Sequence, residues 1–449
     1  MAVIRPFIGT RFDTEKVGPW SNVLAPPYDV ISEPMRAALC ARSENNVVHI
    51  DFGKPGDQGD GCADQYERAA KLFAQWRDSG ALIDEAEPCL YIYAQRYTLP
   101  DGREITRAGF FSAVELMELG PGGVMPHERT FEGPKADRLN LTRATHANFS
   151  AIFALYTDAE GRANRLIADR MAAEPPRDSA TTDDGITHSL WAVSDPDFIA
   201  QMQAVLADQP LYIADGHHRY ETAQNYAAEC QREGNLLGRE PEPSDHVLMY
   251  LVNTDDPGLE ILPTHRVLHR DLAGDAEAFR RRAEEHFDVS PLGLRWDTEP
   301  DAAARLQRDL AQAGERGTSF AVLLPGGEGM MMTLKPDADL DAMIPEAMPR
   351  EKKSLDATVL HAHVLSRCWL DDPGRDIGHD DCAYVRDIGE AMDLLRAGEH
   401  GVAFLMNSTT MDQLKAISTI GERMPQKSTY FFPKIATGVV LRDMGLPLG

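Results

Sequence analysis

The sequence predicts an α/β fold (mixed α+β), because two patterns alternate along the chain. Short apolar runs rich in β-branched and aromatic residues, typical of buried strands, occur at 89–93, 109–114, 188–193, 211–214, 247–252 and 320–324. Apolar residues at helical spacing occur at 66–76, 196–206 and 217–230. Elements of these two kinds bury their apolar faces by packing helices against a sheet.

Local signals define where these elements begin and end. Asp195 suits the N-terminal cap of the helix at 196–206, and Pro196 suits its first position. Stretches rich in Gly, Pro and acidic residues are predicted as loops, at 173–185, 233–245 and 325–329.

The charge balance and the apolar patterning of the chain exclude several classes of protein. The chain has 449 residues, with 45 Lys and Arg against 71 Asp and Glu, so its formal net charge is −26. Such a chain repels phosphate backbones, which argues against nucleic acid as a partner. The N-terminus has no secretory signal pattern, no window is apolar enough to span a bilayer, and the six cysteines are scattered. We expect a cytoplasmic protein of two or three domains with reduced thiols and no membrane partner, of undetermined oligomeric state.

The most informative segment is Asp215–Glu221, Asp-Gly-His-His-Arg-Tyr-Glu, which follows an apolar strand and begins a helix. Unpaired backbone N–H groups and the helix dipole favour an anion at this position. Gly216 allows a ligand to approach closely, and the Arg219 guanidinium can bind two phosphate oxygens. The segment therefore predicts a phosphate site, and a surface turn that merely caps a helix is the alternative.

Other side chains of this segment add chemistry. The side chains of His217 and His218 supply donors near a developing charge, and Asp215 is a suitable oxygen ligand for Mg²⁺. A Zn²⁺ site is less well supported, because adjacent histidines rarely bind one ion and no companion ligand has the right spacing. A P-loop is absent from the sequence, which excludes an ordinary P-loop kinase.

Asp215–Glu221 resembles the phosphate-binding box of the ParB/sulfiredoxin-like superfamily, in which a Gly-x-(His/Arg)-Arg turn binds nucleotide phosphates. Sulfiredoxins carry a catalytic cysteine in this turn. Its absence here argues against sulfinic-acid reduction.

A second block, Met125–Thr130 followed by Gly133–Arg138, looks like that of the free serine kinases of this superfamily. This resemblance implies that Glu128 is the general base on the substrate hydroxyl. It also implies that ATP or ADP is the phosphate donor, that Asp215 and His217 are catalytic residues, and that Asp215 is in addition the ligand of Mg²⁺. The nucleotide contacts that it implies are Gly216, His218, Arg219, Lys135 and Arg138.

Three further blocks, Ala25–Ile31, Leu262–Arg266 and Met424–Lys434, complete a resemblance to the bacterial family called domain of unknown function 1015, from about Pro6 to about Leu441. Candidate substrate contacts in these and the second block are His127, Thr264, His265, Arg266 and Lys427. The residues of Leu262–Arg266 by themselves allow two interpretations: Arg266 faces a carboxylate or phosphate, or it is a solvated basic residue at the end of a strand. The residues of Met424–Lys434 also allow two: a phosphate contact backed by aromatic side chains, or a structural β-segment with exposed lysines.

The expected organisation has three parts: an N-terminal α/β region at 1–110, a ParB/sulfiredoxin-like nucleotide-binding core at 111–270 and a C-terminal α/β region at 271–449. The two central blocks, some 90 positions apart, should meet, because a base and a phosphate site must flank one acceptor. The expected function is phosphorylation of a small molecule, free L-serine first among the candidates. The alternative is a nucleotide-binding or nucleotide-hydrolysing switch without an acceptor, which has no need of an activating carboxylate.

Overall fold

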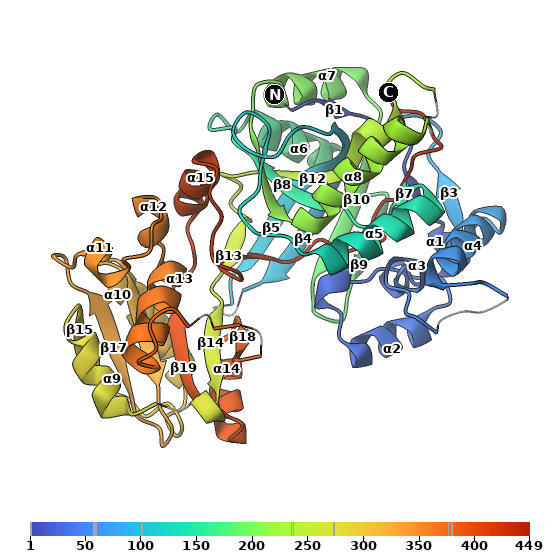
Figure 1. Ribbon diagram of the computed structural model, residues 1–449. Helices are drawn as coiled ribbons and strands as arrows, with labels where there is room; N and C mark the ends of the chain where they lie inside the picture. The colour runs from blue at the N-terminus through green and yellow to red at the C-terminus, as the bar shows by residue number, and fades with distance from the viewer. Residues whose placement is uncertain are drawn as a thin grey trace. The chain divides into compact units, whose positions relative to one another are not determined.

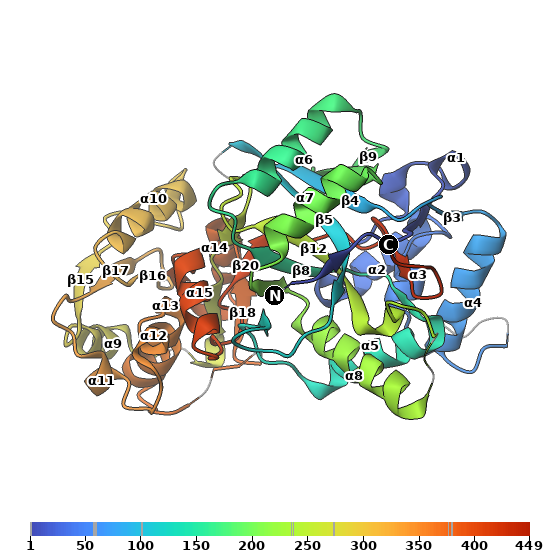
Figure 2. The ribbon, with the colours of Figure 1, turned by 90° about the horizontal axis from the view of Figure 1, so that it is seen from above.

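The computed structural model describes residues 2–56, 61–99, 102–234, 236, 238–272, 274–375, 377–378 and 380–449. The chain forms two compact units (Figure 1; Figure 2). Unit 1 comprises Met1–Leu259 and Pro433–Gly449, and unit 2 comprises Glu260–Phe432. The expected boundary at 110/111 is therefore not a domain boundary, because strand β5 (Glu104–Glu115) runs through it and pairs with strands on both sides.

Unit 1 is built on a mixed sheet that has nine strands among the described residues, in the order β6-β11-β8-β12-β5-β4-β10-β9, with β1 also pairing with β5. The other bounds are β1 (Ile4–Arg5), β4 (Leu90–Thr98), β6 (Val124–Met125), β8 (Ile152–Tyr156), β9 (Asp178–Thr181), β10 (Thr187–Val193), β11 (Leu211–Asp215) and β12 (His246–Asn253). Two short pairs accompany the sheet: β2 (Thr10–Phe12) with β3 (Leu82–Asp84), and β7 (Ala147–Asn148) with β21 (Arg442–Asp443).

Every residue of β8 and β12 is buried, as expected of strands inside a sheet covered on both faces. The helices of unit 1 are α1 (Thr14–Val17), α2 (Glu33–Arg42), α3 (Val48–Asp51), α4 (Gln65–Asp78), α5 (Glu132–Thr145), α6 (Arg162–Ala173), α7 (Pro196–Leu206) and α8 (His217–Glu233). Helices α6 and α7 pack together on the sheet and contribute to its apolar core, while α5 and α8 lie side by side (Figure 1).

The last residues of the chain return to unit 1 and lie along its sheet. The side chain of Gln95 on β4 donates to the carbonyl oxygen of Lys434 (3.0 Å), and Arg107 on β5 donates to that of Pro433 (2.6 Å). Further on, the backbone of Thr437 pairs with Ala25. The sheet thus determines where Lys434 lies.

Unit 2 is built on an antiparallel sheet with the strand order β15-β17-β16-β19-β14-β18, beside a separate pair β13-β20. The strands are β13 (Glu260–Leu262), β14 (His265–His269), β15 (Phe287–Pro291), β16 (Ser319–Leu323), β17 (Gly329–Leu334), β18 (Cys382–Val385), β19 (His400–Met406) and β20 (Tyr430–Phe432). The helices are α9 (Ala276–Ala283), α10 (Ala302–Gly314), α11 (Leu340–Met343), α12 (Arg350–Lys353), α13 (Asp356–Val359), a π-helix (Leu360–Trp369), α14 (Ile388–Ala397) and α15 (Met411–Thr419).

The predicted α/β class is confirmed, and so are the six predicted strands and three predicted helices. Asp195 caps α7 as predicted, accepting from the backbone N–H of Asp197. The predicted loop at 173–185 is partly wrong, because it contains β9. In the part of the chain that is described, none of the helices combines the length and hydropathy of a membrane span.

Candidate functional site

The two central sequence blocks leave the sheet of unit 1 at the same edge. Strand β6 pairs in parallel with β11, with Val124 opposite Leu211 and Met125 opposite Tyr212. Parallel strands have their carboxyl ends on one side, so the segment 126–131 and the turn at Asp215 emerge together. The prediction that these blocks meet is confirmed.

The turn between β11 and α8 depends on Gly216. Its φ is +93°, a backbone conformation that side-chain-bearing residues rarely adopt. A Cβ at this position would lie 2.9 Å from Nε of Arg219. Helix α8 then begins without a side-chain cap and without an acidic residue in its first turn. Its positive dipole end is therefore available to an anion.

The consecutive histidines hold the segment 126–131 against the start of α8. Nε2 of His217 accepts from the backbone N–H of His127 (3.2 Å), and Nε2 of His218 accepts from that of Phe131 (2.9 Å). Since each Nε2 is an acceptor, the proton of each neutral ring lies on Nδ1. Burial lowers the pKa of His218, although Glu128 opposes this shift, so the neutral form is favoured.

Glu128 lies at the centre of this arrangement. Its Oε2 is 3.8 Å from Nδ1 of His217, and its side chain is 33% exposed. His127, a candidate substrate contact, is buried, and its ring packs edge-on against His217 with the centroids 4.7 Å apart. The carboxylate of Glu128 thus reaches solvent from a segment fixed at both ends, beside the start of α8.

Asp215 forms ion pairs with two cations. One oxygen accepts from Arg219 and the other from Lys434. Burial by itself raises the pKa of Asp215, but Lys434 and Arg219 outweigh it and hold the pKa below the usual range of a carboxyl group. Two cations against one carboxylate give the cluster a net positive charge, in a chain whose net charge is −26.

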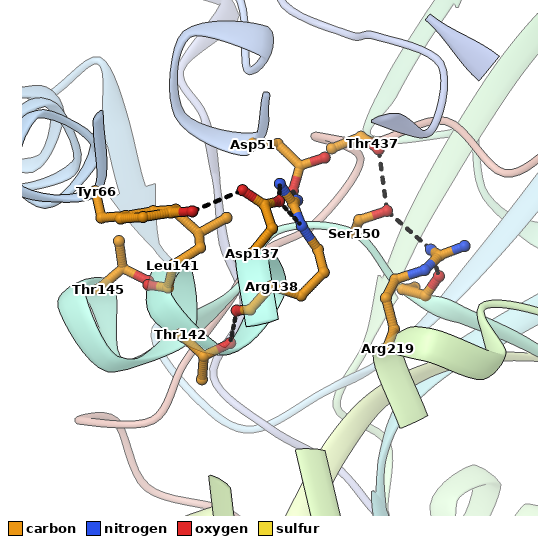
Figure 3. A network of polar contacts seen from close by, with 11 residues as sticks. Asp51, Tyr66, Asp137, Arg138, Leu141, Thr142, Thr145, Ser150, Arg219 and Thr437 are labelled. Atoms are coloured by element: carbon orange, nitrogen blue, oxygen red, sulfur yellow. Dashed lines mark hydrogen bonds and ion pairs between the residues drawn. The ribbon is translucent and has the colours of Figure 1, made fainter. Parts of the chain in front are cut away.

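The Arg219 guanidinium is held by protein groups on its other side as well. It is 8% exposed and donates to Oγ of Ser150 (2.8 Å) and to the carbonyl oxygen of Ala151. Ser150 in turn accepts from Thr437 (3.2 Å), as Figure 3 shows. The Arg219 guanidinium, which was predicted to bind phosphate, is therefore engaged by protein groups of unit 1.

The residues present do not fit a magnesium ion held by Asp215. Both of its carboxylate oxygens are in ion pairs, whereas Mg²⁺ needs carboxylate oxygens for itself. Over the described ranges, no group of three or more His, Cys, Asp or Glu residues is arranged to hold a metal. Asp215 therefore has no carboxylate oxygen left to serve as a metal ligand.

Two of the predicted nucleotide contacts, Lys135 and Arg138, lie on α5 and are also paired. Lys135 lies 3.1 Å from Glu221 of α8 and 2.8 Å from Glu132. Glu221 also accepts from the hydroxyl of Thr130 (2.7 Å), so it ties the segment 126–131 to α8. Lys135 thus acts as a bridge between α5 and α8.

Arg138 is buried between two carboxylates. Nη1 lies 3.1 Å from Asp51 and Nη2 lies 2.6 Å from Asp137, as Figure 3 shows. The guanidinium also lies over the ring of Tyr28, 4.2 Å from its centroid. Burial raises the pKa of Tyr28 to about 12, so the phenol is neutral. A cavity of about 50 Å³ lies between Asp51, Arg138 and Arg219.

The remaining candidates lie in unit 2, where Thr264, His265 and Arg266 are buried. Nε of Arg266 donates to Nε2 of His361 (3.0 Å), and Nη2 donates to the carbonyl oxygen of Lys427 (3.2 Å). Lys427 has a φ of +55°. Arg266 thus holds the turn that carries Lys427, and its burial contradicts the alternative of a solvated strand end. The role of Thr264, His265, Arg266 and Lys427 as substrate contacts stays a prediction.

The site residues chosen from the sequence did not include Lys434 or Ser150. Lys434 is the last residue of the block Met424–Lys434, which the sequence marked as a candidate phosphate contact, but Lys427 was the residue chosen from that block. Its partner Asp215 is 219 positions away, so the contact depends on how the C-terminal segment crosses the sheet. Ser150 carries no local signal of its role.

Comparisons with known proteins add the following. No curated protein matches the chain. Matching solved structures include a free serine kinase in complex with AMP (12% identity, TM-score 0.30, 70% of this chain and 92% of that one). A conserved hypothetical protein from Pyrococcus furiosus matches at 13% identity and a TM-score of 0.32, over 72% of this chain and 92% of that one. SbnI with C-terminal truncation from Staphylococcus aureus matches at 11% identity and a TM-score of 0.31, over 73% of this chain and 85% of that one. Structural similarity with TM-scores this low does not indicate the activity of this chain. Residues 4–358, most of the chain, match the family described as protein of unknown function (DUF1015), and the chain therefore belongs to that family.

Proposed function

We propose that unit 1 is a phosphotransferase that uses a nucleotide, ATP or ADP, to phosphorylate a small hydroxyl compound, with free L-serine as the first candidate. The observation that carries the proposal is the position of Glu128. Its partly exposed carboxylate is held 3.8 Å from His217, next to a helix N-terminus and a cluster of net positive charge. A site that only senses a nucleotide has no need of such a carboxylate.

Each part of the reaction has a candidate group. The α8 backbone N–H groups and the positive cluster favour the phosphates of the donor. Glu128 takes the proton of the acceptor hydroxyl, whose oxygen then bonds to the terminal phosphorus. The bond from that phosphorus to the leaving nucleotide oxygen breaks, and its electron pair stays with the leaving nucleotide. His217, with its proton on Nδ1, orients the Glu128 carboxylate.

Arg219 and Lys135 have a different role from the one that the sequence suggested. Because Asp215, Ser150 and Ala151 engage the Arg219 guanidinium, we propose that it holds the turn in shape and contributes charge at short range. Lys135 fixes α5 against α8. The phosphates would then be bound chiefly by backbone N–H groups and His218, while Lys434, like Arg219, contributes charge at short range.

The test is transfer of labelled phosphate from ATP or ADP to a panel of hydroxylated metabolites led by L-serine. The Glu128→Gln variant should lower turnover about 10²-fold or more while nucleotide affinity changes little, because glutamine cannot accept the proton. Glu160→Gln, at an exposed carboxylate before α6, is the control. Nucleotide binding or hydrolysis that no acceptor stimulates would favour the switch instead. Near-normal turnover in folded Glu128→Gln would remove Glu128 from the base role.

A further inference from the structure

Phe131 combines two features that do nothing for stability. It is the N-cap residue of α5, and its side chain makes no capping hydrogen bond there, whereas Ser, Thr, Asp and Asn are the residues that favour this position. The residue is also 52% exposed, the highest value among the exposed large hydrophobic residues that are described. A single exposed apolar residue is ordinary, but this one gains little from burial and also leaves a helix uncapped, which costs stability.

The ring of Phe131 is nevertheless held in place. Its backbone N–H donates to Nε2 of His218 (2.9 Å), and its ring stacks on the His218 imidazole with the centroids 6.0 Å apart and 21° between the planes. The lowered pKa of His218 keeps that imidazole neutral. One face of an exposed aromatic ring is thus supported by a flat, uncharged partner, three residues after Glu128.

We propose that Phe131 is the stacking platform for the base of the nucleotide, which completes a stack in the order base, Phe131, His218. A planar aromatic base has the shape that the exposed ring face fits, and base–aromatic stacking tolerates different bases because each has a π-face. The position also agrees with the chemistry of the turn, since His218 is in the first turn of α8, where the phosphates would bind. Sites that break local rules of stability are commonly functional ones. This inference rests on the proposed function, because it requires a nucleotide as the donor.

The test measures stability and affinity in the same variant. Phe131→Ser introduces a favourable N-cap and gives up little buried surface, so its Tm should rise by about 1–3 °C. Its affinity for ATP and ADP, measured by calorimetric titration, should nevertheless fall about 10-fold or more, because the stacking contact is lost. Its affinity for inorganic tripolyphosphate, which has no base, should not change.

Two further variants complete the experiment. Phe131→Trp keeps a flat aromatic ring and should retain the affinity for ATP, whereas Met35→Ser, at an exposed apolar residue of α2, should leave all three affinities unchanged. If Phe131→Ser binds ATP as tightly as the unmodified chain does, or loses tripolyphosphate equally, the stacking role is wrong while the proposed function stands. If the unmodified chain binds no nucleotide, the proposed function fails and this inference fails with it.

Discussion

At the scale of single residues, Asp215 determines the electrostatics of the candidate site. Its carboxylate separates two cations that would otherwise repel each other in a poorly solvated place. Arg219 and Lys434 are 8% and 14% exposed, so water screens these pairs little. The pairing explains how a buried turn can be positively charged and still fold.

Replacing Asp215 with asparagine should therefore cost more stability than replacing Lys434. Asp215→Asn leaves two cations without a balancing carboxylate, and we expect the free energy of unfolding to fall by about 3 kcal/mol. Lys434→Met leaves the Asp215–Arg219 pair intact and should cost about 1 kcal/mol. Urea denaturation of the two variants measures the difference, and equal losses would contradict this account of the cluster.

The lowered pKa of Asp215 also has a consequence for acid stability. Because its folded pKa lies below its unfolded value of about 3.9, its contribution is fully present above that value. It is lost only as the pH falls through the folded pKa. Asp215→Asn should remove this part of the acid transition. Because Asp215 is ionised in both the folded and the unfolded chain above about pH 5, the variant should lose the same free energy of unfolding at pH 6 as at pH 8.

At the scale of elements, the site depends on the turn from β11 to α8 and on the segment 126–131. Three side chains of the first two turns of α8, namely His217, His218 and Glu221, accept hydrogen bonds from that segment. The short parallel pairing of β6 with β11 brings the segment within their reach. A two-residue strand and three hydrogen bonds to α8 thus place Glu128.

Gly216 offers a clean test of how tightly this turn is packed. Gly216 and Gly122 share a φ of +93°, but a Cβ on Gly122 would meet nothing within 4 Å, whereas one on Gly216 would meet the Arg219 guanidinium at 2.9–3.1 Å. Gly122→Ala should cost about 1–2 kcal/mol, from backbone strain alone. Gly216→Ala should cost more, because Arg219 must move away from Asp215 and Ser150. Thermal unfolding compares the two, and similar losses would show that Arg219 adjusts freely.

Element types were the part of the fold that local patterns predicted well. The strand at 211–214 and the helix after it follow from an apolar run, a glycine and helical spacing. Strand β8 was not predicted, although its residues are as apolar as those of the predicted strands. Strand β9 was also missed, because its sequence Asp-Ser-Ala-Thr has no alternation and is a strand only through pairing with β10.

At the scale of the whole molecule, buried histidines should make stability depend on pH. Burial lowers the pKa of several of them, most strongly of His188, His246 and His363, to about 4, and of His265 and His361, to about 3. Between these values and about 6.5 the unfolded chain binds more protons than the folded one, so stability rises with pH across that window and is complete above it. Each histidine contributes a slope of about 1.4 kcal/mol per pH unit.

The expected result is a Tm that is flat above pH 7 and falls steeply between pH 6.5 and pH 5. Asp256 acts in the opposite sense, because burial raises its pKa to about 6, but it offsets the effect of only one histidine. Thermal scans from pH 8 to pH 5 check the prediction, and calorimetry in buffers of different ionisation enthalpy counts the protons taken up on unfolding. A Tm that stays constant down to pH 5 would show that these histidines already bind protons in the folded chain.

The sequence by itself determined the α/β class, the family and the two blocks that form the candidate site, because each depends on residues close together in the chain. The ParB/sulfiredoxin-like character of residues 111–270 stays a prediction. Only the tertiary structure decided that Lys434 pairs with Asp215, that Arg219 is held by Ser150 and Ala151, and that Arg266 supports a turn. The reason is physical: local spacing specifies helices and strands, whereas the partner of a buried charge depends on which distant segments the sheet brings together.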